Sequence, residues 1–580
     1  MSSPRSDGFG DAALLVVIGL LAALVAGVWL WGAAAGVLFG AGAPHLAPGQ
    51  LLVVLVHLPG HLNDPALAWP PPERVRLPGA VGCYTALAIV GGGLGAAGAG
   101  LTRVAGPWLG RNPSGARWAS GGELRALRGT RRTLSPGALW QRRPGDPDST
   151  SAQAARLVLG RHRGRLLYGE HRHALVAFGP PQSGKSAGLA VPALLAWPGP
   201  AVASSIKTDL LSVTQTRRAA LGPTFIFDPF ALSGTNSHTW SPLRGATTWD
   251  GALEAAWRLA CSGEVDGRGV EGGDFWAIAA EQRLAPLMFV ASRSGEGIET
   301  LVRWAYGQGT RELHAALAQI AGEASDEAQL GDAHAAYDAV RAFEAQADRT
   351  RTSIEATAQA LLRAYRFKRV AHSARSCEIT PDGILDSAAT LYLIGDAKAS
   401  KLLRPLFLAL LSEIVDRAYE RATLAGGRLE HPLLLCLDEA GNVAPLPNLA
   451  EIASTAPSHN IQLVSIFHDL QQARARYGKQ AETVVNAHRA RMLLPGVADL
   501  ETLRYFAGLL GEEEIRELTR TSGAGGATRS VSQRRRPLSA PEALRQLPDR
   551  HALLLYGRLA PTRVRLRMWF EDRRLRTLGG

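Results

Sequence analysis

The stretch of sequence that decides the fold reads Gly179-Pro180-Pro181-Gln182-Ser183-Gly184-Lys185-Ser186. It satisfies the phosphate-loop pattern G-x-x-x-x-G-K-[ST] at every fixed position. The apolar run 175–178 precedes it and is typical of a buried strand, and the run 187–197 that follows has the composition of a helix. A strand–loop–helix context is what this motif requires, so we expect an α/β protein that binds a nucleoside triphosphate.

The phosphate loop and the residue after it, Ala187, are the expected nucleotide-binding residues. The glycines of the loop let backbone N–H groups face the phosphates. Lys185 is expected to act in catalysis by binding the β- and γ-phosphates, and Ser186 is expected to bind Mg²⁺. ATP and Mg²⁺ are therefore the expected cofactors. The alternative of a coincidental turn is disfavoured by the complete match in its required context.

A second motif lies further along the chain, where the apolar run 433–437 ends in Asp438 and Glu439. Asp438 is expected to hold the magnesium ion, and Glu439 to orient or activate the attacking water as a general base. Such a run is common on its own, and the phosphate loop upstream gives it this meaning. His468 follows another expected strand, 462–467, and is the main candidate for sensing the γ-phosphate. The alternative for His468 is an ordinary surface histidine.

Five further charged residues are weaker candidates. Arg404, Arg489 and Arg491 are candidates for an arginine that acts across a subunit interface, although each of them is more often structural or exposed. Lys207 and Asp209 follow the second expected strand and could face the site or a translocation channel.

Short apolar runs alternate with helical segments from about residue 160, which is the rhythm of an α/β domain with a parallel sheet. Between 249 and 388 no convincing series of strands is present, and the Ala-rich helical spacing predicts an all-α domain inserted into the α/β domain. The expected strands are 174–178, 201–205, 224–227, 390–394, 433–437, 462–467, 490–494, 552–556 and 563–569.

Two apolar segments near the N-terminus, 14–39 and 81–101, are long enough to cross a bilayer. The glycines of the second segment would allow close helix packing. A cleaved signal peptide is the alternative for the first segment, and a buried helix of a soluble domain is the alternative for the second. Nine Arg and one Glu occur from Arg103 to Arg143, which places the long C-terminal part in the cytoplasm. In the external loop, 51–58 could form a short strand.

The 580-residue chain has a formal net charge of +12, which favours anionic partners such as nucleic acid or the inner face of a membrane. Its four cysteines have no metal-ligand spacing, which argues against a structural zinc and a disulfide scaffold. The Arg-, Gly-, Pro- and Ser-rich segment 103–159 reads as a basic juxtamembrane linker, and 519–537 reads as a flexible loop.

Taken together, several of these segments resemble the type IV secretion coupling proteins, the conjugative DNA-transfer ATPases of the TraG/TraD-like kind. The resemblance runs from about 166 to 556, and the two N-terminal membrane segments fit it. The segments that carry it are 179–197, 204–210, 227–229, 274–276, 438–478 and 536–548.

The chain departs from this family's pattern at three places. His468 stands where the family usually has Gln, and Ala440 follows Glu439 where the family commonly has an aromatic residue. After the second strand the family often has Asp-x-Lys-Gly-Glu, and this chain has the sequence of 205–209 instead. The departures suggest a divergent branch with an altered γ-phosphate sensor.

The resemblance implies a RecA-like nucleotide-binding domain with an inserted all-α domain and a two-helix membrane anchor in the inner membrane of a bacterium. The expected boundaries are an anchor at 1–102, a linker at 103–159, an ATPase domain formed by 160–248 and 389–580, and an inserted domain at 249–388.

The resemblance also implies the activity and the partners. ATP hydrolysis would drive a relaxase-bound single strand of DNA, held without sequence preference, into a secretion channel, with a homo-hexamer as the working form. A coupling ATPase for protein effectors and a double-stranded DNA pump of the FtsK-like kind are the alternatives, although no DNA-reading module follows Trp569. A scaffold with vestigial motifs is disfavoured because Lys185, Ser186, Asp438 and Glu439 are intact.

Overall fold

The structure is a computed structural model of the chain, and it divides into two compact units, Met1–Pro113 and Ser114–Gly580. The residues that it describes are 8–109, 115–128, 156–170, 173–262, 273–523 and 526–579.

The N-terminal unit contains two long helices, α1 (Gly8–Phe39) and α4 (Ala80–Leu109). Within the described part of the chain, only α1 has a stretch long and apolar enough to cross a membrane, Ala22–Phe39. The apolar stretch of α4, Ala80–Ala96, is shorter, so the expected second span is not confirmed. The structure thus supports one apolar N-terminal helix and does not support a multi-pass anchor.

The two long helices α1 and α4 pack on each other. Trp31 Nε1 donates a hydrogen bond of 2.6 Å to the carbonyl of Cys83. A Cβ added to Gly32 would lie 2.0 Å from the Trp69 ring, so this glycine of α1 permits a close approach. The close packing expected at the glycines of the second apolar segment is absent over 91–95, where an added Cβ would meet nothing within 4 Å.

The strand expected at 51–58 is wrong, because α2 (Pro48–His57) is a helix there. Pro48 stands in its first turn, where the missing N–H costs nothing, and the Gln50 side chain accepts a hydrogen bond of 3.2 Å from the Ala47 N–H. These start signals outweigh the β-branched residues of the run.

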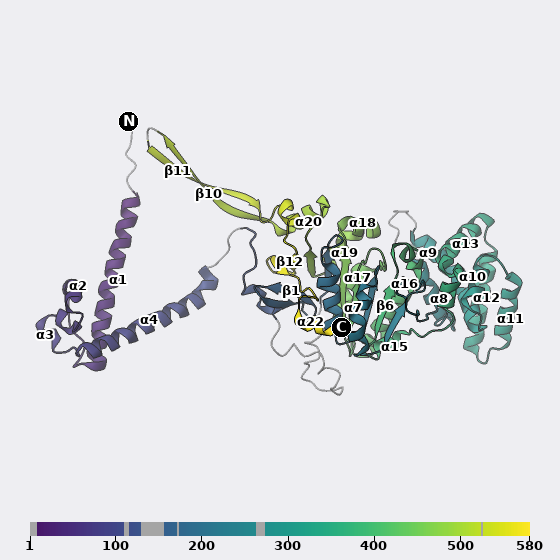
Figure 1. Ribbon diagram of the computed structural model, residues 1–580, viewed down its shortest axis with the longest axis horizontal. Helices are drawn as coiled ribbons and strands as arrows, with labels where there is room; N and C mark the ends of the chain where they lie inside the picture. Colours follow the sequence, from purple (N-terminus) through teal and green to yellow (C-terminus); the bar gives the residue numbers. More distant parts are fainter. Residues whose placement is uncertain are drawn as a thin grey trace. The chain divides into compact units, whose positions relative to one another are not determined.

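The second unit contains an 11-stranded mixed sheet with the order β2-β1-β13-β12-β9-β3-β8-β7-β4-β6-β5 (Figure 1). Neighbouring strands from β9 to β5 are parallel, whereas β12, β13, β1 and β2 continue the sheet antiparallel. The strands are β1 (Val158–His162), β2 (Arg165–Tyr168), β3 (Leu175–Phe178), β4 (Ala201–Ser205), β5 (Thr224–Phe227), β6 (Thr390–Ile394), β7 (Leu433–Leu437), β8 (Ile461–Phe467), β9 (Ala490–Leu493), β12 (His551–Tyr556) and β13 (Thr562–Arg565).

The seven parallel strands agree with the sequence-based expectation to within one residue at each end, which confirms the α/β class. The antiparallel extension differs from the parallel sheet that was expected. The last expected strand, 563–569, is shortened to β13, and β1 and β2 were not expected.

The expected linker 103–159 is only partly a linker. Helix α4 continues into it as far as Leu109, and β1 begins before its end. A short 3₁₀ helix, Glu123–Leu127, packs Leu124 and Leu127 into the core of the sheet. Residues 129–155 of the expected linker lie outside the described residues.

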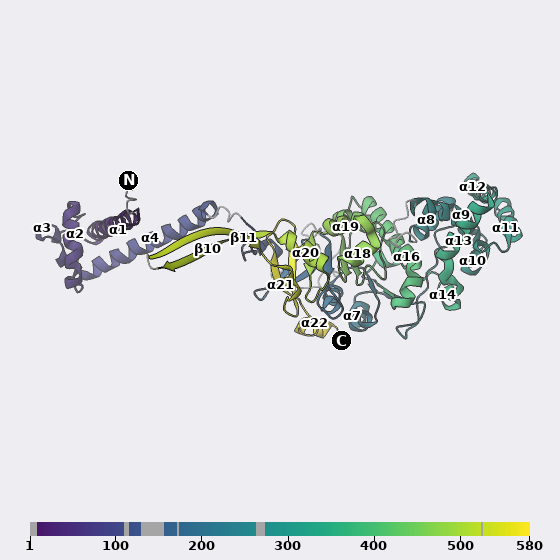
Figure 2. The same cartoon turned by 90° about the horizontal axis from the view of Figure 1, so that it is seen from above.

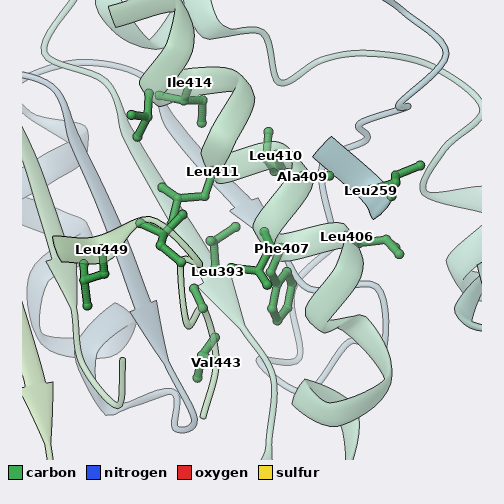
Figure 3. Close-up of a cluster of buried hydrophobic side chains, with 14 of the residues drawn as sticks. Leu259, Leu393, Leu406, Phe407, Ala409, Leu410, Leu411, Ile414, Val443 and Leu449 are labelled. Carbon is green, nitrogen blue, oxygen red and sulfur yellow. The ribbon is translucent and has the colours of Figure 1, made fainter. Parts of the chain in front are cut away.

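Successive residues of each strand point to two different helical layers. In β7, Leu433, Leu435 and Leu437 belong to the core under α16 (Ala397–Leu424). Leu434 and Cys436 belong to the opposite core, under α6 (Val191–Ala196) and α7 (Asp209–Ala219). Figure 3 shows part of the first core, with Phe407 and Leu411 of α16 beside Leu393 of β6. The alternation explains why strands buried on both faces read as continuous apolar runs.

Between β5 and β6 the described residues form helices and no strand. Helix α9 packs against α8, α12 and α13, and α8 packs against α16. That this segment is a separate inserted domain stays a prediction. The helices are α8 (Trp249–Cys261), α9 (Gly273–Arg293), α10 (Ile298–Ala305), α11 (Thr310–Gly322), α12 (Glu327–Glu344), α13 (Asp348–Leu362), α14 (Lys368–His372) and α15 (Pro381–Leu385).

The flexible loop expected at 519–537 is wrong. These residues belong to a long hairpin of β10 (Glu512–Gly523) and β11 (Gly526–Pro537), which projects from the sheet as a separate two-stranded ribbon (Figure 2). At its base, Arg536 Nε donates to Glu513 Oε1 at 2.7 Å. No strand signal is present in the sequence at 532–537, because these residues of β11 are all exposed and lack the apolar alternation that marks most strands.

Candidate nucleotide site

Three neighbouring parallel strands bring the predicted motifs together. Strand β8 lies between β3 and β7, and the carboxyl ends of all three meet at one edge of the sheet. The phosphate loop follows β3, Asp438 and Glu439 follow β7, and His468 follows β8. The topology therefore juxtaposes segments that are far apart in the sequence.

The backbone of the phosphate loop needs residues that tolerate the left-handed region. Gly184 has φ +88°, and Gln182 has φ +66° although it is not a glycine. A Cβ on Gly179 would lie 2.5 Å from Ser183 Oγ, so a glycine is required there. The Gly179 N–H donates to the carbonyl of Phe467 at 3.0 Å, which ties the loop to the end of β8.

Lys185, Glu439 and His468 form a triangle of contacts. The Lys185 ammonium forms an ion pair with Glu439 Oε1, and its Nζ lies 2.9 Å from His468 Nδ1. His468 Nε2 lies 2.8 Å from Glu439 Oε2. Because Nδ1 accepts from the ammonium, Nε2 is the nitrogen that donates to the carboxylate. Lys185 is 7% exposed and Glu439 is 4% exposed, so this pair is shielded from water.

The Glu439 carboxylate is held in its charged form. Burial favours the neutral acid, but the hydrogen bonds from His468 and Lys185 and the positive charge of Lys185 outweigh it and lower the pKa of Glu439 to about 2. Its backbone has φ +61°, a strained value for a residue with a side chain. A catalytic position is the usual place for such strain.

Two residues that support this triangle were missed in the sequence. Asn442 Nδ2 donates a hydrogen bond to Glu439 Oε2 at 2.9 Å. The backbone N–H of His468 donates a hydrogen bond to Gln472 Oε1 at 2.7 Å. Neither lies in a motif. Their only sequence signal is a position three or four residues after a predicted site residue, which is one turn of chain away.

Asp438 and Ser186 meet on the other side of the loop. Ser186 Oγ donates to Asp438 Oδ2 at 2.5 Å, while Asp438 Oδ1 is buried and has no hydrogen-bond partner among the described residues. Burial raises the pKa of Asp438 to about 6, and the hydrogen bond from Ser186 opposes that rise only in part. A buried carboxylate oxygen without a donor beside a hydroxyl is a donor set that suits a hard divalent cation.

The C-terminal part of the chain covers the phosphate loop. A Cβ on Gly184 would lie 3.3 Å from Met568 Cε, and a Cβ on Gly188 would lie 3.0 Å from Leu566. The Trp569 N–H donates to the carbonyl of Ala187 at 3.1 Å. Residues 566–569, once expected to prolong a strand, thus form a wall of the loop.

Arg489 and Arg491 have partners elsewhere in this chain, and the action of the candidate arginines across a subunit interface stays a prediction. Arg489 precedes β9, at the edge of the sheet opposite the phosphate loop, and forms an ion pair of 3.5 Å with Glu170. Arg491 donates to the carbonyls of Val485 and Asn486 at 3.1 Å each. Arg404 is 8% exposed within α16, which disfavours a reach into a neighbouring subunit.

Lys207 and Asp209 lie after β4, next to β7 at the carboxyl edge, with exposed side chains. Neither contacts the triangle among the described residues. Their roles stay predictions, as do those of Pro180 and Pro181 in nucleotide binding.

Comparison with known proteins gives a family and a fold. A family model described as type IV secretory system conjugative DNA transfer matches residues 131–578. The conjugal transfer protein TraG of Escherichia coli is 25% identical over 415 residues, which cover 66% of this chain and 63% of TraG. Protein VirD4 of Rhizobium radiobacter is 23% identical over 422 residues, which cover 71% of this chain and 59% of VirD4. The match therefore spans less than two thirds of these relatives.

The plasmid coupling protein TrwB provides similar solved structures. TrwB in complex with ADP and Mg²⁺ has a TM-score of 0.54 at 19% identity, with 78% of this chain and 93% of TrwB covered. TrwB in complex with the ATP analogue ADPNP has a TM-score of 0.52 at 19% identity, with 79% of this chain and 94% of TrwB covered. This likeness shows a shared fold.

Proposed function

We propose that this chain, which belongs to the type IV secretory system conjugative DNA transfer family, is a membrane-anchored ATPase that drives DNA into a secretion channel. The single observation that carries the ATPase is the meeting of the phosphate loop with Asp438 and Glu439 at one edge of the sheet. Family membership supports the DNA as load.

ATP and Mg²⁺ are the proposed cofactors. The phosphate loop would hold the phosphates through its backbone and Lys185, and Ser186 and Asp438 would hold the cation. The unpartnered Oδ1 of Asp438 supports this assignment, as do the ADP and Mg²⁺ in the TrwB complex. When bound, Mg²⁺ neutralises charge that develops on the phosphates.

Glu439 is the proposed general base. With its pKa near 2 it is ionised at neutral pH and can accept a proton from water. Asn442 and His468 both hold Oε2, so Oε1, the atom that contacts Lys185, is the one available to accept that proton. Lys185 must leave Oε1 before its ammonium can bind a phosphate.

His468 is proposed as the sensor that connects these two states, because it contacts both Lys185 and Glu439. A rearrangement of either partner changes the hydrogen bonds of the imidazole. In this way the end of β8 would register whether Lys185 is paired with the carboxylate or with a phosphate.

The membrane anchor, the assembly and the partners are proposed on family grounds. Helix α1 is the proposed membrane span, and the ATPase is placed on the cytoplasmic side of a bacterial inner membrane. A homo-hexamer would receive a relaxase-bound single strand and pass it to secretion-channel proteins. The helices between β5 and β6 are proposed to form a separate domain that recognises the relaxase-bound strand.

The test is ATP hydrolysis by the full chain in lipid nanodiscs, with single-stranded DNA, with duplex DNA and without DNA. Stimulation that is strongest with single strands and is lost in Lys185→Ala is the expected result. Turnover that no DNA changes would instead support a protein load, and a preference for duplex would support a double-strand pump. Absence of ATP turnover under all conditions would contradict the proposed ATPase activity.

A further inference from the structure

A hollow lies away from the nucleotide site, within the same compact unit. It has a volume of 920 Å³ and lies between the β1–β2 pair, the last residue of α6, the last turn of α7 and α22 (Arg573–Leu578). Helix α22 lies beside α7 in both views of the structure and packs on α6 and α7 (Figures 1 and 2). Because Ala196 ends α6, the hollow is at the opposite end of this helical segment from the phosphate loop.

The hollow carries a large excess of positive charge. Its lining includes two acids, and both are already engaged by arginines. Asp572 accepts from Arg161 at 2.9 Å and from Arg567 at 2.7 Å, and Glu571 is paired with arginines on the side of β13. The arginines that line the hollow are Arg156, Arg161, Arg217, Arg567, Arg573 and Arg574.

Three of these arginines have a structural task. Arg161 and Arg567 hold Asp572, which caps the start of α22. Arg156 donates to the carbonyl of Gly169 at 2.7 Å and to that of Tyr168 at 3.3 Å. These contacts fix the walls of the hollow and leave the other three arginines unexplained.

Arg217, Arg573 and Arg574 form no ion pair within the described part of the chain. The Nε atom of Arg217 is buried and has no hydrogen-bond partner there, and burial lowers the pKa of Arg217. A buried donor without an acceptor is costly to keep unless something supplies the acceptor. Arg573 and Arg574 stand in the first turn of α22, where positive charge does not stabilise a helix.

Apolar residues also line the hollow. They are Val158 of β1, Leu166 of β2 and Leu575 of α22. Guanidinium groups match phosphate oxygens in charge and in the geometry of their donors. A lining that combines arginines with apolar residues suits a ligand that carries both a phosphate and an apolar group.

We propose that this hollow is a second ligand site, which binds a phosphate-bearing molecule through Arg217, Arg573 and Arg574. The phosphate can belong to a free small molecule or to a lipid headgroup, since both present the same oxygens. The site does not depend on the phosphate loop, and it stands whether or not the chain hydrolyses ATP.

The test is hydrogen exchange on the full chain, in detergent with inorganic pyrophosphate as the soluble probe, and reconstituted in vesicles containing phosphatidic acid as the lipid probe. Protection of peptides from β2 and α22 is the expected result, and it is read separately from protection of 179–187. Pyrophosphate protection identifies a soluble ligand, and protection by phosphatidic acid vesicles alone identifies a headgroup. Either result supports the proposal.

Variants decide whether the arginines are responsible. The double change Arg217→Ala and Arg574→Ala should weaken binding at β2 and α22 by at least about tenfold, because charge-assisted hydrogen bonds are lost. Arg504→Ala, which removes an exposed arginine of another helix, should leave it unchanged. Arg217→Lys keeps the charge and should retain part of the affinity, and it also serves if the double variant does not fold.

Three outcomes overturn the proposal. The first is absence of protection at β2 and α22 with both probes, and the second is equal binding in the double variant and in Arg504→Ala. The third is protection by single-stranded DNA alone, which would make this surface part of a nucleic-acid path and not a site for a small phosphate ligand.

Discussion

The two ends of one helical segment, 186–196, are surrounded by charges that are arranged in opposite ways. At its beginning, Lys185 is buried against Glu439, and His468 contacts both. At its end, six arginines and two acids line one hollow together with apolar residues, so the acids are too few to pair all the arginines. Paired charges can be buried because each one satisfies the other, whereas unpaired ones indicate that a partner comes from outside the chain. The first arrangement is marked by motifs, and the second is visible only in three dimensions.

Removing the ammonium tests the first arrangement most severely. Lys185→Ala should lower ATP turnover by about 10³-fold or more, because the main positive charge on the phosphates is lost. Steady-state phosphate release measures it. Lys479→Ala, an exposed lysine outside the site, is the control and should change turnover less than about twofold. Similar losses in both variants would contradict the assignment of the loop.

Removing the negative charge of the pair should separate binding from hydrolysis. Glu439→Gln keeps the shape but cannot accept the proton, so turnover should fall by about 10²- to 10³-fold while ATP still binds. Equilibrium binding of a fluorescent ATP analogue and single-turnover hydrolysis measure the two effects. Unchanged hydrolysis would remove Glu439 from the mechanism.

The bridging imidazole should have a smaller effect. His468→Ala should slow hydrolysis by about tenfold, and His468→Gln should restore most of the rate, because an amide can both accept from Lys185 and donate to Glu439. Single-turnover rates at saturating ATP compare the three forms. Equal rates would make His468 an ordinary polar residue at the end of β8.

The orienting amide should have a smaller effect again. Asn442→Ala removes one hydrogen bond to Glu439 Oε2 and should lower the catalytic rate by about three- to tenfold without changing ATP affinity. Asn448→Ala, an exposed asparagine six positions further along, is the matched control. A loss of affinity in place of rate would place Asn442 in nucleotide binding.

The acid that faces the proposed cation should affect stability and not only activity. The pKa of Asp438 is raised by burial from 3.8 to about 6, so the folded chain keeps a proton that the unfolded chain has released. The free energy of unfolding without Mg²⁺ therefore falls as the pH rises from about 4 to 6. Asp438→Asn removes this loss and should stabilise the metal-free chain by about 1–3 kcal/mol at pH 7.5, and by less at pH 5. Thermal unfolding at both values measures it, and a gap independent of pH would contradict the shift.

The parallel part of the sheet could be predicted because two physical signals coincide there. Strands such as β4 and β7 are buried on both faces and read as continuous apolar runs, and functional residues follow where they end. The pairing of Lys185 with Glu439 follows from the carboxyl ends of parallel strands meeting at one edge. The phosphate loop was located by its motif, and Asp438 and His468 were located at the ends of expected strands.

The remainder could not be predicted, because its signals are not local. Strands β1 and β2 are short and lie in an Arg- and Gly-rich stretch. They are strands because β1 pairs with β13 and β2 pairs with β1. At 532–537 in β11 the side chains are all exposed, so no buried face imposes an apolar pattern on this part of the ribbon. Asn442 belongs to no motif, and its contact with Glu439 depends on a backbone with φ +61°.

Residues 566–569 lie on the phosphate loop, and a few residues later Asp572 begins α22 beside the arginine-lined hollow. One short stretch of chain thus touches both ends of the segment 186–196. The Trp569 N–H, which donates to the carbonyl of Ala187, is only a few residues from the start of α22. We therefore expect a displacement of α22 to be transmitted along the main chain to the residue that follows the phosphate loop.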